Sequence, residues 1–119
     1  MIFKDNQVLV SFHVKDLSFI DERNLSSIFH ILDKLHIKIN VMQNSAISLS
    51  ICVSNEPQKI NELITILKND FKILYNEGLL LITVKNYNQL TIDQVSNEKD
   101  ILLEQRTRQT YQIVVGSES

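Results

Sequence analysis

Apolar residues follow two different periods along the chain, and the change from one period to the other predicts strands and helices in turn. Apolar and polar residues alternate in 8–14 and again in 47–53, which is the two-residue period of a strand with one covered face. Between these stretches, apolar residues recur at helical spacing over 25–35, as the single stripe of an amphipathic helix requires. The pattern predicts strands at 8–14, 37–42, 47–53, 72–75 and 79–84, helices at 25–35 and 57–67, and a hairpin over 101–115.

Turn and cap residues separate these elements. Asn24 is expected to cap the first helix, because its side chain can accept a hydrogen bond from a free backbone N–H. Pro57 suits the first turn of the second helix. The run Asn76-Glu77-Gly78 predicts a turn between two strands, and the polar stretch 87–100 is expected to hold one or two helical turns.

One part of the sequence occurs twice. Residues 39–53 and 101–115 share Ile, Gln, Ile and Val at four places, with a constant offset of 62. The stretch 9–16 matches 79–86 in the same way, at an offset of 70. Strand, spacer and hairpin therefore recur in the same order, and the second spacer is shorter by 8 residues. Such a duplication predicts two related structural units.

The order of elements favours an α+β fold. The first unit is βαββαβ, which is the ferredoxin-like arrangement of a two-layer sandwich with an antiparallel sheet. The second unit has a first strand, a reduced helix and a hairpin, and lacks a second helix and a last strand. Alone it would leave a sheet edge and apolar surface open, so we expect another segment or another chain to complete it.

Composition narrows the possible partners. The chain has 119 residues, 44% of them hydrophobic, and a net charge of −2. It has no block of Lys and Arg, so neither nucleic acid nor a membrane surface is an expected partner. A single Cys is typical of a reducing compartment. Only two Gly are present, which argues against a phosphate-binding loop.

No set of residues predicts catalysis. The three histidines, His13, His30 and His36, have no metal-ligand spacing, so no metal site is expected. Cys52 lies in an alternating strand with no base placed beside it, and is interpreted as a packed residue. Arg106 and the other charged residues of the predicted turns are expected to face solvent.

Three segments carry a resemblance to a known family: SFIDERNLSSIF (18–29), KINVMQNSAISLSICV (38–53) and NEGLLLITV (76–84). With them the chain resembles, over roughly residues 7–115, the C-terminal regulatory region of aspartate kinase (aspartokinase), and most of all the monofunctional enzymes of the Bacteroidetes type. That region consists of two ACT domains, which are small amino-acid-binding modules of βαββαβ form. The resemblance implies a first ACT domain at 7–84 and a partial second ACT domain at 79–115, with a shared boundary.

The resemblance also implies a function. The kinase domain that would precede residue 1 is absent, so this chain is not expected to be an enzyme and needs no cofactor. The parent protein would be an ATP-dependent phosphotransferase that acts on the aspartate side-chain carboxylate and uses ATP and Mg. The family architecture implies a cytoplasmic homodimer joined through ACT domains, attached to its N-terminal kinase domain. An amino-acid effector, lysine or threonine, would exert feedback control of aspartate-family biosynthesis.

Position by position, the resemblance assigns effector contacts to the loop before the first helix, to the strand after it and to the next turn. These residues are Ser18, Asp21, Asn24 and Leu25; Lys38, Ile39 and Asn40; and Asn44, Ser45 and Ala46. Asp21 is expected to meet a lysine ε-ammonium in a charge-assisted contact. Lysine-sensitive members commonly carry aspartate where Asn40 stands and an acidic residue where Ala46 stands. Lysine is favoured as the effector, with threonine second.

Two other functions belong to different classes. A ligand-independent dimerisation module of the same enzyme would explain the open edges of the second unit. A small enzyme of ferredoxin-like fold, such as an acylphosphatase, is disfavoured because it needs an arginine in the loop after the first strand. Here that loop begins Lys15-Asp16, and its one arginine, Arg23, lies beside Asp21 and Glu22.

Overall fold

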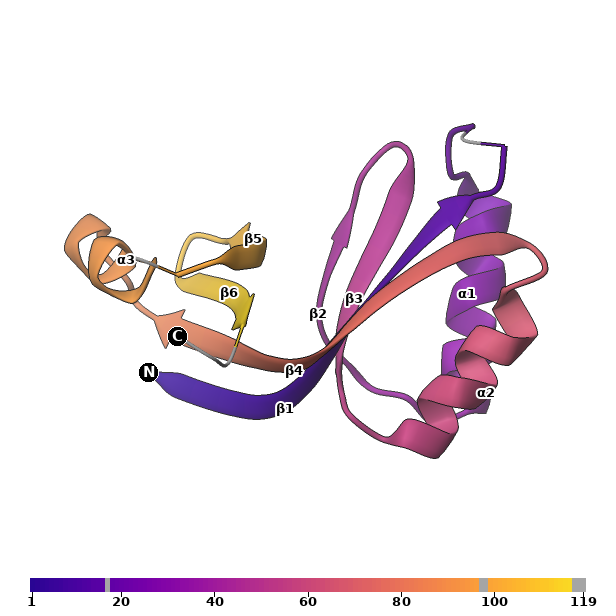
Figure 1. Ribbon diagram of the computed structural model, residues 1–119. Helices are drawn as coiled ribbons and strands as arrows, with labels where there is room; N and C mark the ends of the chain where they lie inside the picture. Colours follow the sequence, from indigo (N-terminus) through magenta and orange to yellow (C-terminus); the bar gives the residue numbers. More distant parts are fainter. Residues whose placement is uncertain (17, 97–98, 117–119) are drawn as a thin grey trace.

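The computed structural model describes residues 1–16, 18–96 and 99–116, and its six strands form one antiparallel sheet (Figure 1). The elements in chain order are β1 (Ile2–Val14), α1 (Glu22–Lys34), β2 (Ile39–Asn44), β3 (Ser48–Ser54), α2 (Pro57–Leu67), β4 (Phe71–Lys85), α3 (Gln89–Ser96), β5 (Ile101–Arg106) and β6 (Thr110–Gly116). The sheet order is β2-β3-β1-β4-β6-β5. The α+β class and the βαββαβ order of the first six elements are confirmed.

Two long strands, β1 and β4, run side by side through the whole sheet (Figure 1). Their pairing shifts twice. One extra residue on β1 lies between the pairs Lys4↔Leu81 and Gln7↔Leu79, and one extra residue on β4 follows before Leu9↔Asn76. Each shift is a β-bulge, which bends a strand and increases its twist. The two bulges therefore divide one continuous sheet into two units.

The positive backbone angles at the bulges explain why these residue types stand there. Asn6 has φ 54° and Gly78 has φ 68°, in the left-handed region that asparagine and glycine tolerate best. The turn expected at Asn76-Glu77-Gly78 is wrong, because β4 continues through it. A glycine with positive φ inside alternating residues marks a bulge as well as a turn.

The first unit comprises residues 7–76, and α1 and α2 cover one face of its strands (Figure 1). Alternate residues of β1 and β3 face these helices, as the two-residue period predicts. The core of the unit comprises Val8, Val10, Phe12, Ile20, Ile28, Leu32, Ile37, Leu49, Ile51, Val53, Ile60, Leu63, Leu67 and Phe71. The helical stripes predicted for the two helices are therefore the stripes that pack.

The second unit comprises Ile2–Lys4 together with residues 79–116. Ile2, Phe3 and Lys4 pair with Thr83, Ile82 and Leu81, so the start of β1 supplies the last strand that the second unit was expected to lack. Helix α3 confirms the helical turns expected within 87–100, and covers the second hairpin with a core of Ile82, Val84, Ile92, Val95, Tyr111, Ile113 and Val115. The division into ACT domains at 7–84 and 79–115 stays a prediction, because strands β1 and β4 belong to both units.

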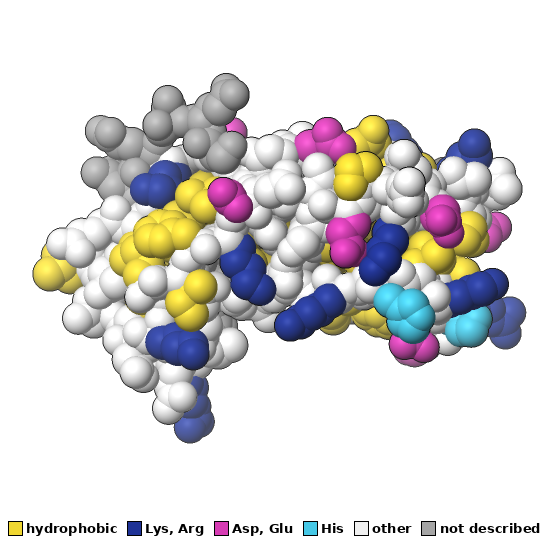
Figure 2. Space-filling view, turned by 90° about the horizontal axis from the view of Figure 1, so that it is seen from below, with side chains coloured by type: hydrophobic (Ala, Val, Ile, Leu, Met, Phe, Trp, Pro, Cys, Tyr) yellow, Lys and Arg dark blue, Asp and Glu magenta, His cyan; other side chains and the backbone are white. Residues whose placement is uncertain are grey.

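Helix α3 leaves part of the second unit uncovered. Phe3 is 59% exposed and Leu90 is 66% exposed. Figure 2 shows several hydrophobic side chains at the left end of the molecule, where Figure 1 places this unit, with charged side chains between them. The second unit, in which α3 is the one described helix, therefore has exposed apolar surface.

A third apolar cluster lies on the sheet face away from all three helices. Its members come from both hairpins and both long strands: Leu9, Val41, Cys52, Leu79, Leu81, Leu103 and Val114. Figure 1 shows the hairpins β2-β3 and β5-β6 facing each other, with α1 and α2 outside one and α3 outside the other. The cluster holds the two units together.

The sequence repeat corresponds to a structural repeat. Strands β5 and β6 begin 62 residues after β2 and β3, and β3 and β6 have the same order of buried and exposed positions. Each hairpin has one extra residue at the equivalent place, Asn40 in β2 and Leu102 in β5. Each turn is also closed in the same way, with the backbone N–H of Ser45 or Thr107 donating to the carbonyl oxygen three residues later. The duplication predicted from four identities is confirmed.

Candidate functional site

The loop before α1 and the turn between β2 and β3 lie against each other at one end of the first unit. The backbone N–H of Ile20 donates to the carbonyl oxygen of Ala46 at 2.9 Å. Ser18, Asp21, Asn44 and Ser45 are exposed around this contact, and Leu25 is half-buried against the core. The structure therefore brings together seven of the ten residues assigned to effector binding: Ser18, Asp21, Asn24, Leu25, Asn44, Ser45 and Ala46.

Helix α1 begins with a reciprocal pair of hydrogen bonds. The Asp21 carboxylate accepts from the Asn24 backbone N–H at 2.9 Å, and the Asn24 side-chain oxygen accepts from the Asp21 backbone N–H at 3.0 Å. Asp21 is thus the N-cap, and α1 begins at Glu22, before the expected start at residue 25. Asn24 does help to cap the helix, because its side chain accepts from a backbone N–H as expected, but it does so from within the first turn. The carboxylate stabilises the helix start, and its remaining lone pairs face solvent.

The other polar side chains of this loop and turn are also engaged locally. The Asp16 carboxylate accepts from the Ser18 backbone N–H at 3.0 Å. Hydrogen bonds from the Ser18 side chain and backbone lower the pKa of Asp16. The Ser45 hydroxyl accepts from the Ser48 backbone N–H at 3.1 Å and closes the hairpin turn. Asn44, a predicted site residue at the end of β2, has an exposed side-chain amide, and no described residue forms a hydrogen bond with it.

The remaining predicted residues, Lys38, Ile39 and Asn40, lie at the other end of β2. Asn44 lies four positions after Asn40 along the strand, which at about 3.3 Å per residue is roughly 13 Å. Within one copy of the chain, the two groups of predicted residues do not surround a common ligand-sized space.

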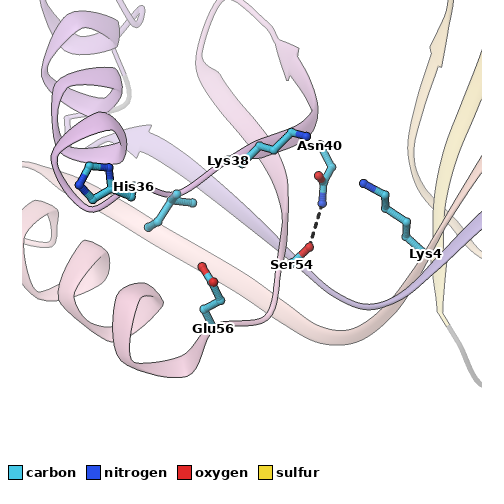
Figure 3. Close-up of a pocket in the computed structure, with 7 residues that line it drawn as sticks. Lys4, His36, Lys38, Asn40, Ser54 and Glu56 are labelled. Carbon is cyan, nitrogen blue, oxygen red and sulfur yellow. Dashed lines mark hydrogen bonds between the residues drawn. The ribbon is translucent and has the colours of Figure 1, made fainter.

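A pocket of about 200 Å³ lies beside this second group (Figure 3). It is lined by Lys4, His36, Ile37, Lys38, Asn40, Ser54 and Glu56. In Figure 3 the Lys4 and Lys38 side chains extend toward Asn40 from opposite sides, and Glu56 points into the pocket from the start of α2. The Glu56 carboxylate is 3.4 Å from the Lys59 ammonium. Neither Lys4 nor Lys38 forms an ion pair within the described part of the chain.

Asn40 connects the pocket to a buried polar group. Its side-chain Nδ2 donates to Oε1 of Gln7 at 2.7 Å and to Oγ of Ser54 at 3.3 Å. Gln7 is 2% exposed, and its Oε1 also accepts from the Cys52 thiol at 3.3 Å. Burial raises the pKa of Cys52 to about 11, against a small opposing effect of the Lys4 charge. The thiol therefore stays protonated, and the interpretation of Cys52 as a packed residue is confirmed.

The comparisons with known proteins concern the fold. No protein-family model and no curated protein matches the chain. Solved structures do match. A C-terminal regulatory domain of aspartate kinase from Porphyromonas gingivalis W83 superposes with a TM-score of 0.83 at 10% identity, over 98% of this chain and 85% of that one. The chain has the fold of an aspartate kinase regulatory region.

Two further structures support this assignment. The regulatory subunit of aspartate kinase from Thermus flavus matches with a TM-score of 0.74 at 7% identity, over 98% of this chain and 87% of that one. Aspartokinase III of Escherichia coli, solved in complex with lysine and aspartate, matches with a TM-score of 0.79 at 17% identity. The match covers 98% of this chain and 29% of the E. coli chain, so the chain spans less than a third of that enzyme.

The three histidines considered as candidate metal ligands do not belong to a metal-binding cluster within the described residues. His13 lies on a strand and His30 on α1, and the described residues contain no group of three or more His, Cys, Asp or Glu that could hold a metal ion. His36 follows α1 with φ 57°, and its carbonyl oxygen accepts from the Lys59 ammonium at 3.1 Å. No described helix is long and apolar enough to cross a membrane.

The sequence did not predict Lys4, Ser54 and Glu56 as pocket residues. It also did not predict Gln7 as the buried partner of Asn40 and Ser54. Ser54 follows the predicted strand 47–53 and Glu56 precedes the predicted helix 57–67, so both carried only the ordinary signals of a loop. Lys4 lies before the first alternating stretch. One signal was available in the sequence. Gln7 is a polar residue directly before the apolar strand 8–14, and a polar side chain that is buried there needs a hydrogen-bond partner.

Proposed function

We propose that this chain is the regulatory region of an aspartate kinase and that it binds a free amino acid, L-lysine in preference to L-threonine, at an interface between two copies. The observation that carries the proposal is the position of the two groups of predicted contact residues. They lie at opposite ends of β2, and β2 is an edge strand of the sheet.

An edge strand has unpaired backbone N–H and C=O groups along one side. A second copy related by a two-fold axis would pair its own β2 with this edge in antiparallel orientation. If the axis passes through the middle of Ile39–Asn44, Lys38 of one copy lies opposite Ser45 of the other, and Ile39 lies opposite Asn44. The two groups that are separate in one copy then meet across the interface, twice per dimer.

The assembled site has the chemistry that an amino acid requires. The loop and turn from one copy provide Asp21, whose free lone pairs can accept from an ammonium group. The other copy provides Lys38 and the amide of Asn40 for a carboxylate and an ammonium. Asn40 and Ala46 bring no negative charge to the site, so Asp21 is the carboxylate that favours lysine over threonine.

The rest of the proposal concerns the parent protein. It would be a cytoplasmic enzyme in which an N-terminal kinase domain uses ATP and Mg to phosphorylate aspartate. Effector binding would favour one arrangement of the dimer and so change the kinase rate, because a ligand shifts an equilibrium only through its different affinities for the two states.

A second function is favoured by a different observation. Met42 is 37% exposed on β2 and Ile47 is 50% exposed in the next turn, so the edge of the first unit carries apolar surface that a second copy can bury without any ligand. In that case the chain is a ligand-independent dimerisation module of the same enzyme.

Isothermal titration calorimetry with L-lysine and L-threonine, together with sedimentation of the same samples, separates these functions. The effector proposal expects saturable binding of lysine, loss of binding in Asn40→Ala and in Asp21→Ala, and tighter dimerisation with lysine present. Asn61→Ala, an exposed position on α2, is the matched control and should bind as the unchanged chain does. A stable dimer with no binding of either amino acid would overturn the effector proposal in favour of the dimerisation module.

A further inference from the structure

The pocket at Asn40 is built from both structural units. Lys4 lies on the part of β1 that pairs with Leu81 in the second unit. Lys38 and Asn40 lie at the start of the first hairpin, in the first unit. A ligand in this pocket therefore contacts both units at once, close to the bulge at Asn6 where they divide.

The polar groups around the pocket differ in how far they are already satisfied. Asn40 uses its Nδ2 on Gln7 and Ser54, which turns its amide oxygen away from the buried network. No described residue donates to that oxygen, and no described carboxylate lies within ion-pair distance of Lys4 or Lys38. The pocket therefore offers two ammonium groups and one amide oxygen, with the Glu56 carboxylate on its far side.

We infer that this pocket holds the head group of a free α-amino acid, and that Lys4 is a further residue that determines its binding. The inference rests on the proposed function and adds a residue from the second unit to its site. The α-carboxylate lies between the Lys4 and Lys38 ammonium groups, and the α-ammonium donates to the Asn40 amide oxygen and faces Glu56. The two lysine ammonium groups match the negative charge of the α-carboxylate, and the amide oxygen matches the positive charge of the α-ammonium.

The size of the pocket supports a head group and excludes a larger ligand. At about 200 Å³ it is smaller than the roughly 300–1,000 Å³ typical of pockets for drug-sized molecules. The side chain of the amino acid must extend out of it. In the proposed dimer, the neighbouring surface is the hairpin turn of the second copy, so the pocket fixes the head group while the interface selects the side chain.

Binding here has a consequence for the two units. Lys4 and Lys38 line the same pocket from different units, and their like charges repel each other. A carboxylate between them would replace this repulsion by two attractions, so it would bind a residue of each unit.

Calorimetry of four chains tests the inference. They are the unchanged chain, Lys4→Met, Lys38→Met and, as a control, Lys72→Met, an exposed position on the first-unit part of β4. Loss of one charge-assisted contact predicts affinity for L-lysine about tenfold weaker in Lys4→Met and in Lys38→Met. Lys72→Met should bind normally. Cadaverine, which is lysine without its carboxylate, should bind weakly and equally to the unchanged chain and to Lys4→Met.

The failures of the two proposals are distinguishable. If L-lysine binds Lys4→Met as tightly as the unchanged chain, the role of Lys4 is overturned while the proposed function stands. If no amino acid binds the unchanged chain, the proposed function fails, and titration with acetate while the Asn40 side-chain amide is followed by NMR tests the carboxylate pocket alone. A saturable shift of that signal that is lost in Lys4→Met supports the pocket, and no shift overturns it.

Discussion

Replacing Gln7 by methionine tests how much the buried polar group between the two units contributes to stability. Gln7 is the only buried polar residue among those the structure describes. Its Nε2 donates to the Asp5 carbonyl oxygen at 3.1 Å and to Ser54 Oγ at 3.4 Å. Its Oε1 accepts from Asn40 at 2.7 Å and from Cys52 at 3.3 Å. A methionine fills nearly the same space and makes none of these contacts.

The expected loss follows from the two short hydrogen bonds, to Asp5 and from Asn40. Each neutral hydrogen bond contributes a net of about 1 kcal/mol, and the two longer contacts contribute less. Because the volume is conserved, no cavity cost is added. We therefore expect Gln7→Met to lower the free energy of unfolding by about 2 kcal/mol, or the melting temperature by roughly 8 °C for a chain of 119 residues.

Urea unfolding followed by circular dichroism measures the change. Gln105→Met, at an exposed position on β5, is the matched control and should change the free energy of unfolding by less than about 0.5 kcal/mol. A double-mutant cycle with Asn40→Ala should give a coupling of about 1 kcal/mol for the shortest bond. If Gln7→Met is as stable as the unchanged chain, the buried network contributes nothing beyond packing, and the reasoning is refuted.

Four further changes have expected outcomes. Gly78→Ala should cost about 1–2 kcal/mol in urea unfolding, from its φ of 68° alone, since a Cβ there meets no atom within 4 Å; an unchanged midpoint would contradict this. Asp21→Ala should cost about 1 kcal/mol through loss of the helix cap, and Asp21→Ser much less. The Cys52 thiol, with a pKa of about 11, should resist a thiol-exchange reagent at pH 8 until the chain unfolds. Burial and the Glu104 contact raise the pKa of Tyr111 from 10.0 to about 12. As the pH rises, the unfolded chain therefore loses the Tyr111 proton before the folded chain does, and the free energy of unfolding should fall between pH 10 and pH 12. This fall should be smaller in Tyr111→Phe, which has no proton to lose.

Local sequence patterns predicted the hairpins and helices because each depends on neighbouring residues. The two hairpins related by the 62-residue repeat share even the extra residue, Asn40 or Leu102, and the hydrogen bond that closes each turn. The helical turns expected within 87–100 form α3, in which Ile92 and Val95 are buried and Leu90 is exposed.

Features that depend on distant residues were not predictable in this way. The strand Ile2–Lys4 has too few residues to show a period, and its partners lie on β4. Gly78 marked a break in the pattern, but the sequence alone does not distinguish a turn from a bulge. The pocket at Asn40 needs Lys4 from one unit beside residues of the other, and no spacing along the chain indicates that contact.

The candidate site shows the same division. The resemblance grouped the contact residues of the loop and turn, and these do lie together through the hydrogen bond from Ile20 to Ala46. The same resemblance placed Lys38, Ile39 and Asn40 in that site, whereas in one copy they lie at the far end of β2. A common site for the two groups depends on the proposed dimer, and the sequence of one copy does not indicate which ends of two copies would meet.

The pairing of β1 with β4 also sets the order in which the chain can fold. Ile2 pairs with Thr83, and Val14 pairs with Phe71, so each end of the first strand has a partner far along the sequence. Such non-local pairing is slow, because a long loop must close before any contact stabilises it. During synthesis the start of β1 has no partner until most of the chain has emerged. We therefore expect the first helices and hairpin to form early, and both units to become native in one late cooperative step.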